Sequence, residues 1–127
     1  MRNAGYRIPV DGGGLGSVTK GAWYGVPFAS MHYVSIQVWG TFAATYNIEV
    51  TLDPNAILVH EPLDLLPGAE GHADAATIPP ATITQPNSLV GLTVGGFYPI
   101  NNAFVALRIN VTAYTSGSVR AVALFVP

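Results

Sequence analysis

A chain of 127 residues, half of them hydrophobic, has the length of one domain and can bury a substantial core. Only 9% of the residues are charged and the formal net charge is −2, so the chain lacks both the basic face of a nucleic-acid-binding protein and the charge excess of a disordered one. With no cysteine, disulfides, thiolate metal ligands and thiol nucleophiles are excluded. We expect no export signal and no membrane segment, because neither an apolar signal core nor about 20 consecutive apolar residues occurs. A chain so poor in charge either hides much of its surface or associates with other molecules.

The first 16 residues are predicted to form an extended, flexible N-terminal arm, and residues 17–127 to form a single domain. Glycine at positions 12, 13, 14 and 16 supplies the hinge between them. We expect Tyr6, Arg7 and Ile8 of the arm to contact a partner. The glycine run does not match a phosphate-binding loop, because Lys20 follows Thr19 instead of a glycine and no helix is predicted after it.

Alternation of apolar and polar residues predicts strands. In residues 32–39, Val34, Ile36 and Val38 share one face. Residues 45–52 and 103–114 alternate in the same way, and Gly40 is expected to join the first two strands as a hairpin. Further candidate strands are residues 6–10, 18–24, 56–60, 81–84 and 88–94.

The last predicted strand, residues 118–126, is apolar on both faces. Such a strand is either central in a covered sheet or buried against a neighbouring subunit, so we expect Val122 and Leu124 to contact a partner. No stretch has the period of a helix. Together the segments predict an all-β single domain of about eight antiparallel strands, a β-sandwich of jelly-roll-like type.

Residues 53–86 contain six of the ten prolines, which predicts a long loop excursion from the sandwich. The loop holds two histidines with acidic neighbours: His60 with Glu61, and His72 with Glu70 and Asp74. A zinc site needs three or four ligands that converge on a rigid scaffold, so we expect no metal and no cofactor here.

Four carboxylates could supply the pair that hydrolyses a glycoside: Glu49, Asp53, Glu61 and Asp64. Nothing in the sequence holds any two of them at a catalytic separation, and no nucleophile motif is present. His32 begins a strand and is expected to be a packed or interfacial residue and not a ligand. We therefore expect no catalytic residues, with a small hydrolase that uses Glu49 or the His60–Glu61 pair as an alternative.

Tyr33 and Trp39 share the less apolar face of the strand at residues 32–39, which favours their exposure. Exposed aromatic rings on a sandwich can stack on sugars, and they are also common at protein–protein interfaces. A carbohydrate-binding module is therefore a second alternative, with Tyr33 and Trp39 as its ligand-stacking residues.

Two stretches have a characteristic order of strands and turns. Residues 34–54 read VSIQVWGTFAATYNIEVTLDP, with Gly40, Thr41, Phe42 and Thr45 between two strands. Residues 103–124 read AFVALRINVTAYTSGSVRAVAL, a strand, a Thr-Ser-Gly turn and an apolar strand, with Arg108, Asn110, Val111, Thr112, Ser116 and Gly117 carrying the pattern. Both stretches resemble hairpins of small β-sandwich structural proteins in tailed-bacteriophage virions.

The resemblance implies a non-enzymatic virion structural protein, of the capsid cement or decoration type. Such a protein is a homo-oligomer, expected to be a trimer, that binds the major capsid protein or another virion protein and stabilises the shell by burying surface across capsomer junctions. It would be located in the virion, after assembly in the host cytoplasm. The alternative is a tail, neck or fibre-associated module with a structural or carbohydrate-binding role.

Overall fold

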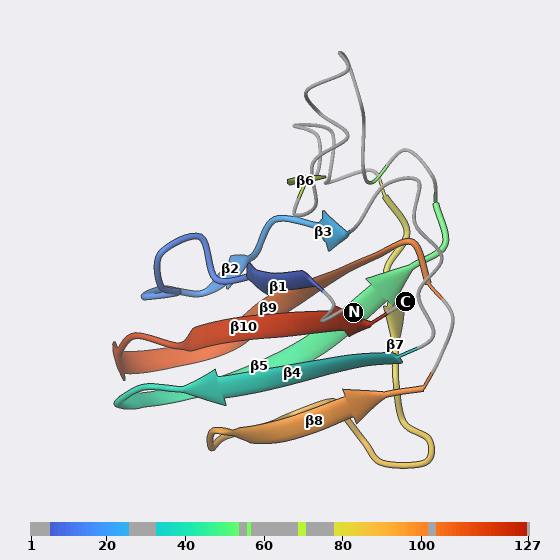
Figure 1. Cartoon of the computed structure of the whole chain (residues 1–127). Coiled ribbons are helices and arrows are strands. Elements are labelled where there is room, and N and C mark those ends of the chain that lie inside the picture. The colour runs from blue at the N-terminus through green and yellow to red at the C-terminus, as the bar shows by residue number, and fades with distance from the viewer. Residues whose placement is uncertain are drawn as a thin grey trace.

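The computed structural model describes residues 6–25, 33–53, 56, 69–70, 78–101 and 104–126, and among them it contains β-strands and no α-helix (Figure 1). The strands are β1 (Tyr6–Pro9), β2 (Thr19–Lys20), β3 (Tyr24–Gly25), β4 (Tyr33–Trp39), β5 (Phe42–Thr51), β6 (Ala69–Glu70), β7 (Ala81–Thr82), β8 (Gly96–Ile100), β9 (Ala106–Gly117) and β10 (Arg120–Val126). Within this part of the chain we find no helix of the length and apolarity needed to cross a membrane. The prediction of an all-β protein is confirmed.

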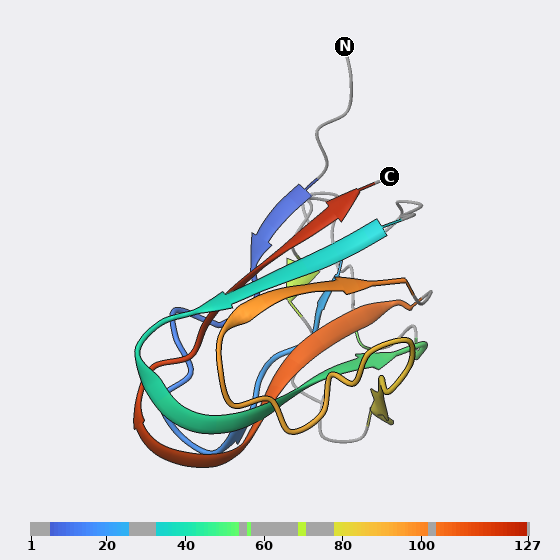
Figure 2. The same ribbon diagram turned by 90° about the horizontal axis from the view of Figure 1, so that it is seen from below.

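The strands form two antiparallel sheets in the described part of the chain. One sheet has the order β1-β10-β4-β8, and the other has the order β6-β3-β9-β5-β7 with β2 also beside β9. In Figure 1 the strands β10, β4 and β8 lie in front of β9 and β5, and Figure 2 shows the layers from below. This arrangement agrees with the predicted antiparallel β-sandwich.

The core lies between the two sheets and follows the predicted alternation. In β4, Val34, Ile36 and Val38 are buried, whereas the residues between them are partly or fully exposed. β10 alternates in the same way. Ile48 of β5 and Ile109 of β9, which are opposite each other, bury their side chains from the second sheet.

Two corners, instead of the hairpins expected from the sequence, join the sheets. Gly40 leads from β4 in one sheet to β5 in the other, and Gly117 leads from β9 to β10. β4 pairs with β10 and β8 and not with β5. The expected hairpin at Gly40 is therefore wrong, because the turn carries the chain across the core to the opposite layer.

The two corners lie side by side. Phe42 pairs with Gly117, and the Ser118 N–H donates to the Thr41 carbonyl at 3.1 Å. The φ angles are 116° at Gly40 and 86° at Gly117, in the region that favours glycine. A Cβ at Gly40 would overlap the Ser118 carbonyl, and one at Gly117 would overlap the Thr41 carbonyl. The backbone of each corner therefore lies so close to the other that only glycine fits at positions 40 and 117.

Residues 6–16 belong to the sandwich, which corrects the prediction of a flexible arm over residues 1–16. β1 forms an edge of the four-stranded sheet beside β10. Ile8 and Val10 are buried in the core, and Leu15 pairs with Val119. Burial of these apolar side chains outweighs the conformational entropy that an arm would retain. Residues 1–5 lie outside the described residues.

Part of the predicted excursion at residues 53–86 is also packed. β7 pairs with the end of β5, and Ile83 is buried in the main core. Ala56 and Ile78 are buried with Trp23 in a second, smaller core. The predicted projection is therefore wrong for Ala56, Ile78 and Ile83, whose side chains are buried. Residues 54–55, 57–68 and 71–77 lie outside the part of the chain that the structure describes.

Some strands differ from the prediction. Residues 18–24 contain two short strands, β2 and β3, and residues 88–94 contain an isolated bridge from Leu92 to Tyr46. β8 was not predicted, because Gly96 and Pro99 break the pattern of β-branched and aromatic residues that identifies a strand.

Gly117→Ala should lower the free energy of unfolding by about 3 kcal/mol or more, because strain at positive φ is added to overlap with the neighbouring corner. Gly91→Ala is the matched control, since Gly91 also has a positive φ, of 70°, but a Cβ at this position would meet no other atom within 4 Å. The control should cost about 1 kcal/mol. Urea unfolding followed by tryptophan fluorescence measures both, and equal losses would contradict the close approach of the corners.

Candidate functional site

The outward-facing residues of the four-stranded sheet form a surface that we call the outer face. Alternate residues of a strand point to opposite sides of a sheet, and these residues alternate with core residues. They are Arg7 and Pro9 in β1; Tyr33, Ser35, Gln37 and Trp39 in β4; Phe97 and Pro99 in β8; and Arg120, Val122, Leu124 and Val126 in β10.

The strand register arranges the outer face in rows across the sheet. The two central rows each cross four strands: Arg7, Leu124, Ser35 and Pro99 form one, and Pro9, Val122, Gln37 and Phe97 form the next. Val126 pairs with Tyr33 at one end of the face, and Arg120 pairs with Trp39 at the other. The face therefore measures roughly 20 Å along the strands and 15 Å across them.

Large apolar side chains are concentrated on the outer face. The exposed fractions are 65% for Tyr33, 42% for Trp39, 68% for Phe97 and 39% for Leu124. These four side chains alone expose roughly 400 Å², if a fully exposed one presents about 200 Å². This total is comparable to the largest apolar patch on a typical monomeric domain, which is often an interaction site.

The outer face is hollowed near its middle. Ser35, Gln37 and Val122 lie at this depression of about 440 Å³, together with Arg7, Phe97 and Leu124. The small Ser35 side chain lies between its larger neighbours Leu124 and Pro99 in its row, which explains the hollow. An incoming side chain can therefore enter the face there.

The outer face carries two arginines and no carboxylate. Arg120 donates from Nε to Asp11 Oδ2 at 2.9 Å, and its guanidinium lies 5.7 Å from the centre of the Trp39 ring. Asp11 is buried beneath the face and also accepts hydrogen bonds from the backbone N–H groups of Ala121 and Gly13. The charge of Arg120 is thus compensated from below, and Arg7 on the edge strand is exposed.

Opposing effects act on the pKa of Asp11. Burial works to raise the pKa, but the hydrogen bonds from Ala121, Arg120 and Gly13 outweigh it and hold the pKa below its usual value of 3.8. The carboxylate is therefore charged at neutral pH, and it anchors the chain segment after β1 and the guanidinium that lies over Trp39.

Five of the residues predicted as partner contacts or ligand-stacking residues lie on this one face: Arg7, Tyr33, Trp39, Val122 and Leu124. Ile8 does not, because it points into the core and is only 6% exposed, so its predicted role as a contact is wrong. The side chain of Tyr6 lies outside the described residues. That the five residues bind a partner stays a prediction.

Phe97, the most exposed aromatic ring of the outer face, is not among the residues predicted from the sequence. Its neighbour Tyr98 is half-buried against the core, so this short segment does alternate. The signal was hidden because two of the five strand residues are Gly96 and Pro99.

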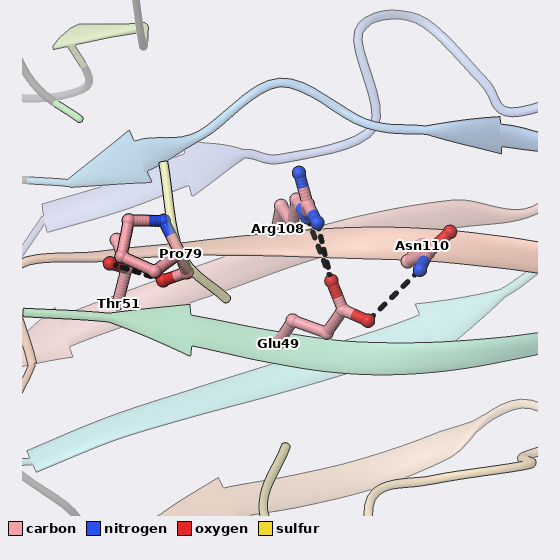
Figure 3. Close-up of polar contacts among 5 residues, drawn as sticks. All are labelled: Glu49, Thr51, Pro79, Arg108 and Asn110. Atoms are coloured by element: carbon pink, nitrogen blue, oxygen red, sulfur yellow. Dashed lines mark hydrogen bonds and ion pairs between the residues drawn. The ribbon is translucent and has the colours of Figure 1, made fainter. Parts of the chain in front are cut away.

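A second polar cluster lies on the six-stranded sheet (Figure 3). Glu49 Oε1 accepts a hydrogen bond from Arg108 Nε at 2.8 Å, and Oε2 accepts one from Asn110 Nδ2 at 2.9 Å. The Arg108 guanidinium lies 4.4 Å from the centre of the Trp23 ring. Glu49 and Arg108 are both buried. With both carboxylate oxygens bonded and the two side chains only 3% and 6% exposed, this arrangement favours a structural role for Glu49 over acid–base chemistry.

Most of the other candidate residues for chemistry cannot be placed, because they lie outside the part of the chain that the structure describes. His32, His60, Glu61, Asp64 and His72 lie outside the described residues, as does Asp74, and the side chain of Glu70 is likewise not described. Among the residues that the structure does describe, no three histidine or acidic side chains are grouped as metal ligands would be. No protein-family model, curated protein or solved structure matches this chain, so its function is inferred from its own surface and fold.

Asp11→Asn should lower the free energy of unfolding by about 1–2 kcal/mol at pH 7, because hydrogen bonds to a charged acceptor become weaker. Folding lowers the pKa of Asp11, so the charged carboxylate stabilises the fold at pH values above 3.8. This contribution is lost as the pH falls through the pKa of the folded state. The difference from the wild type should therefore shrink below pH 3.8. Urea unfolding at a series of pH values measures it, and a difference that is constant with pH would contradict the prediction.

Glu49→Gln should lower the free energy of unfolding by about 3–5 kcal/mol, because it leaves the buried Arg108 charge without its partner. The double variant Glu49→Gln with Arg108→Met removes both charges and should lose clearly less than the two single variants together. A double-mutant cycle from urea unfolding gives this coupling. Additive losses would show that the pair does not interact as described.

Proposed function

We propose that this chain is a non-enzymatic structural protein of a tailed-phage virion, a capsid cement or decoration protein that acts by association. Its copies bind the shell at neighbouring capsomers, and the outer face is their association surface. The main observation in support is the outer face, because its exposed aromatic and aliphatic side chains are typical of an association surface.

The order of the strands supports a jelly roll. In chain order β1, β4, β8 and β10 lie in one sheet, and β3, β5, β7 and β9 lie in the other. The strand orders within the sheets, β1-β10-β4-β8 and β3-β9-β5-β7, are those that two Greek keys produce in a jelly roll. Jelly rolls are frequent among viral capsid and lectin domains, which favours both a virion role and, as a fold alone, a sugar-binding one.

Five of the residues that carry the resemblance to virion proteins lie at the two neighbouring corners. Gly40, Thr41 and Phe42 form one corner, and Ser116 and Gly117 form the corner beside it. The stretches resemble hairpins, and in this chain they form corners between the sheets, so the resemblance supports the proposal through its sequence pattern alone.

A protein of this kind stabilises a shell by binding the assembled form and not its dissociated subunits. Each 100 Å² of apolar surface removed from water contributes about 2.5 kcal/mol before the cost of association. Burial of the outer face at a junction between capsomers would therefore add stability there, and no catalytic group is required.

A sugar-binding module is the second candidate, because one aromatic ring and several hydrogen-bonding groups line the same hollow. Phe97 borders the depression, and Ser35, Gln37 and Arg7 offer hydrogen-bonding groups there. Such a protein would show sugar-competable binding on a glycan array, and Phe97→Ser would abolish it.

The number of copies in purified particles tests the proposal, measured by quantitative mass spectrometry. Hundreds of copies per particle indicate a shell position, and about a dozen indicate a neck or tail position, because copy number follows the symmetry of the site. Absence of the protein from particles would overturn the proposal.

Phe97→Ser should lower the temperature at which particles that carry the protein lose their shell integrity, because Phe97 lies on the outer face. Leu52→Ser is the matched control, since Leu52 is 71% exposed but lies off this face. Particles that carry the control should behave as the wild type does. Equal behaviour of the two variants would remove the outer face from the mechanism.

A further inference from the structure

We propose that the outer face is covered by the outer face of a second copy, in a dimer whose two-fold axis runs parallel to the strands between β10 and β4. This inference deepens the proposed function by naming the occupant of the face. Its test uses the pure protein, so it stands or falls independently of any role in a virion.

The strand order makes the face suited to pair with itself. The four strands β1-β10-β4-β8 have their midpoint between β10 and β4. A two-fold axis at this midpoint places β10 against the partner's β4 and β1 against the partner's β8, with each row of residues against the same row of the other copy. Sheets packed face to face cross at about 30°, so this correspondence is closest near the axis.

Large side chains then meet small ones. Leu124 lies opposite the partner's Ser35, at the hollow of about 440 Å³ that the face contains. Because the axis relates the two copies, the partner's Leu124 enters the hollow over Ser35 in the same way. This mutual insertion is the shape complementarity that a stable interface needs.

The remaining pairs are apolar or place a cation on an aromatic ring. Tyr33 lies opposite the partner's Val126, and Phe97 lies opposite the partner's Pro9. Trp39 lies opposite the partner's Arg120 and can stack with it in addition to its own Arg120. Few polar groups of the face are left to be desolvated, namely Ser35 and Gln37 near the axis.

The charges of the face permit such pairing. Asp11 neutralises Arg120 from within each copy at 2.9 Å. Arg7 lies on the edge strand, so the two copies hold their Arg7 residues on opposite sides of the interface, at least about 14 Å apart at 4.8 Å per strand. This separation exceeds the Debye length of about 8–10 Å in physiological salt, so their repulsion is screened.

The area of the face agrees with a dimer of modest strength. The four most exposed apolar side chains supply roughly 400 Å², about half of the 800 Å² that each partner contributes to a standard interface. Arg7, Pro9, Pro99 and Gln37, which are also exposed, add to it. A second copy has a face of the same size and can cover all of it. An isologous contact of this kind closes as a dimer, in place of the trimer expected from the resemblance.

Sedimentation of the full-length protein over a range of concentrations tests the proposal. The wild type should show a reversible monomer–dimer equilibrium. Gln37→Lys places a charge beside the axis in each copy, where the face offers no carboxylate to pair with it, and should raise the dimer dissociation constant about 30-fold or more. Gln85→Lys is the matched control, since Gln85 is exposed but lies off the outer face, and it should leave the constant unchanged.

Cross-linking tests the position of the axis, and the absence of cysteine makes it specific. The double variant Pro9→Cys with Phe97→Cys places thiols on the two edge strands, three strand spacings apart in one copy but facing each other across the interface. A bis-maleimide whose reach matches the roughly 10 Å between packed sheets should link two copies. A crossing of about 30° moves the edge strands along each other by about one residue, which is half of the distance from Pro9 to Arg7, the next outward residue of β1. Arg7→Cys with Phe97→Cys is therefore the second pair to be tried. The single variants should give no covalent dimer.

Each other outcome overturns the proposal. A monomer at all concentrations, a trimer, or a dimer that Gln37→Lys leaves intact would show that a second copy does not cover the face. A monomer that binds a sugar through Phe97 would assign the face to carbohydrate. A Gln37→Lys dimer defect without any cross-link from either cysteine pair would place the axis elsewhere.

Discussion

The close approach of two chain corners is the constraint on which the rest of this sandwich depends. A Cβ at Gly40 or at Gly117 would overlap a backbone carbonyl of the other corner. The Ser118 N–H donates a hydrogen bond to the Thr41 carbonyl and so links the two corners. At these corners the chain passes from β4 to β5 and from β9 to β10, and each time it passes from one sheet to the other. Because the corners are locked together, the long β5–β9 ladder in one sheet fixes the position of β10 beside β4 in the other.

The two sheets then differ in what covers their outer sides. On the six-stranded sheet, Trp23, Ala56 and Ile78 form a small second core, and the buried Glu49–Arg108 pair lies on that sheet. On the four-stranded sheet the outward side chains remain exposed in the single chain, although Tyr33, Trp39, Phe97 and Leu124 are large and apolar. The asymmetry is what gives the molecule a single outstanding association surface among its described residues, and it is the reason for placing assembly there.

Much of the site was predictable because strand periodicity is a local property. The alternation in residues 33–39 and the two-sided apolar pattern of residues 118–126 identified Tyr33, Trp39, Val122 and Leu124 before their surroundings were known. Phe97 was not predictable, since its strand contains a glycine and a proline. Ile8 was assigned to the wrong environment, because alternation shows which residues share a face but not whether that face meets the core. Likewise, a turn sequence with glycine shows where the chain reverses but not whether it pairs with its neighbour or crosses to another layer.

The sequence by itself therefore determined the all-β class, the main strands and the charge-poor character of the chain, because propensity, periodicity and composition act over a few residues at a time. Only the tertiary structure decided that residues 6–16 join the sandwich, that Glu49 and Arg108 form a buried pair, and that arginine, aromatic and aliphatic residues from four strands share one face. These features depend on contacts between residues far apart in the chain, such as Arg7 with Leu124 and Gln37 with Phe97. Such contacts follow from sheet order and register, which no local pattern encodes.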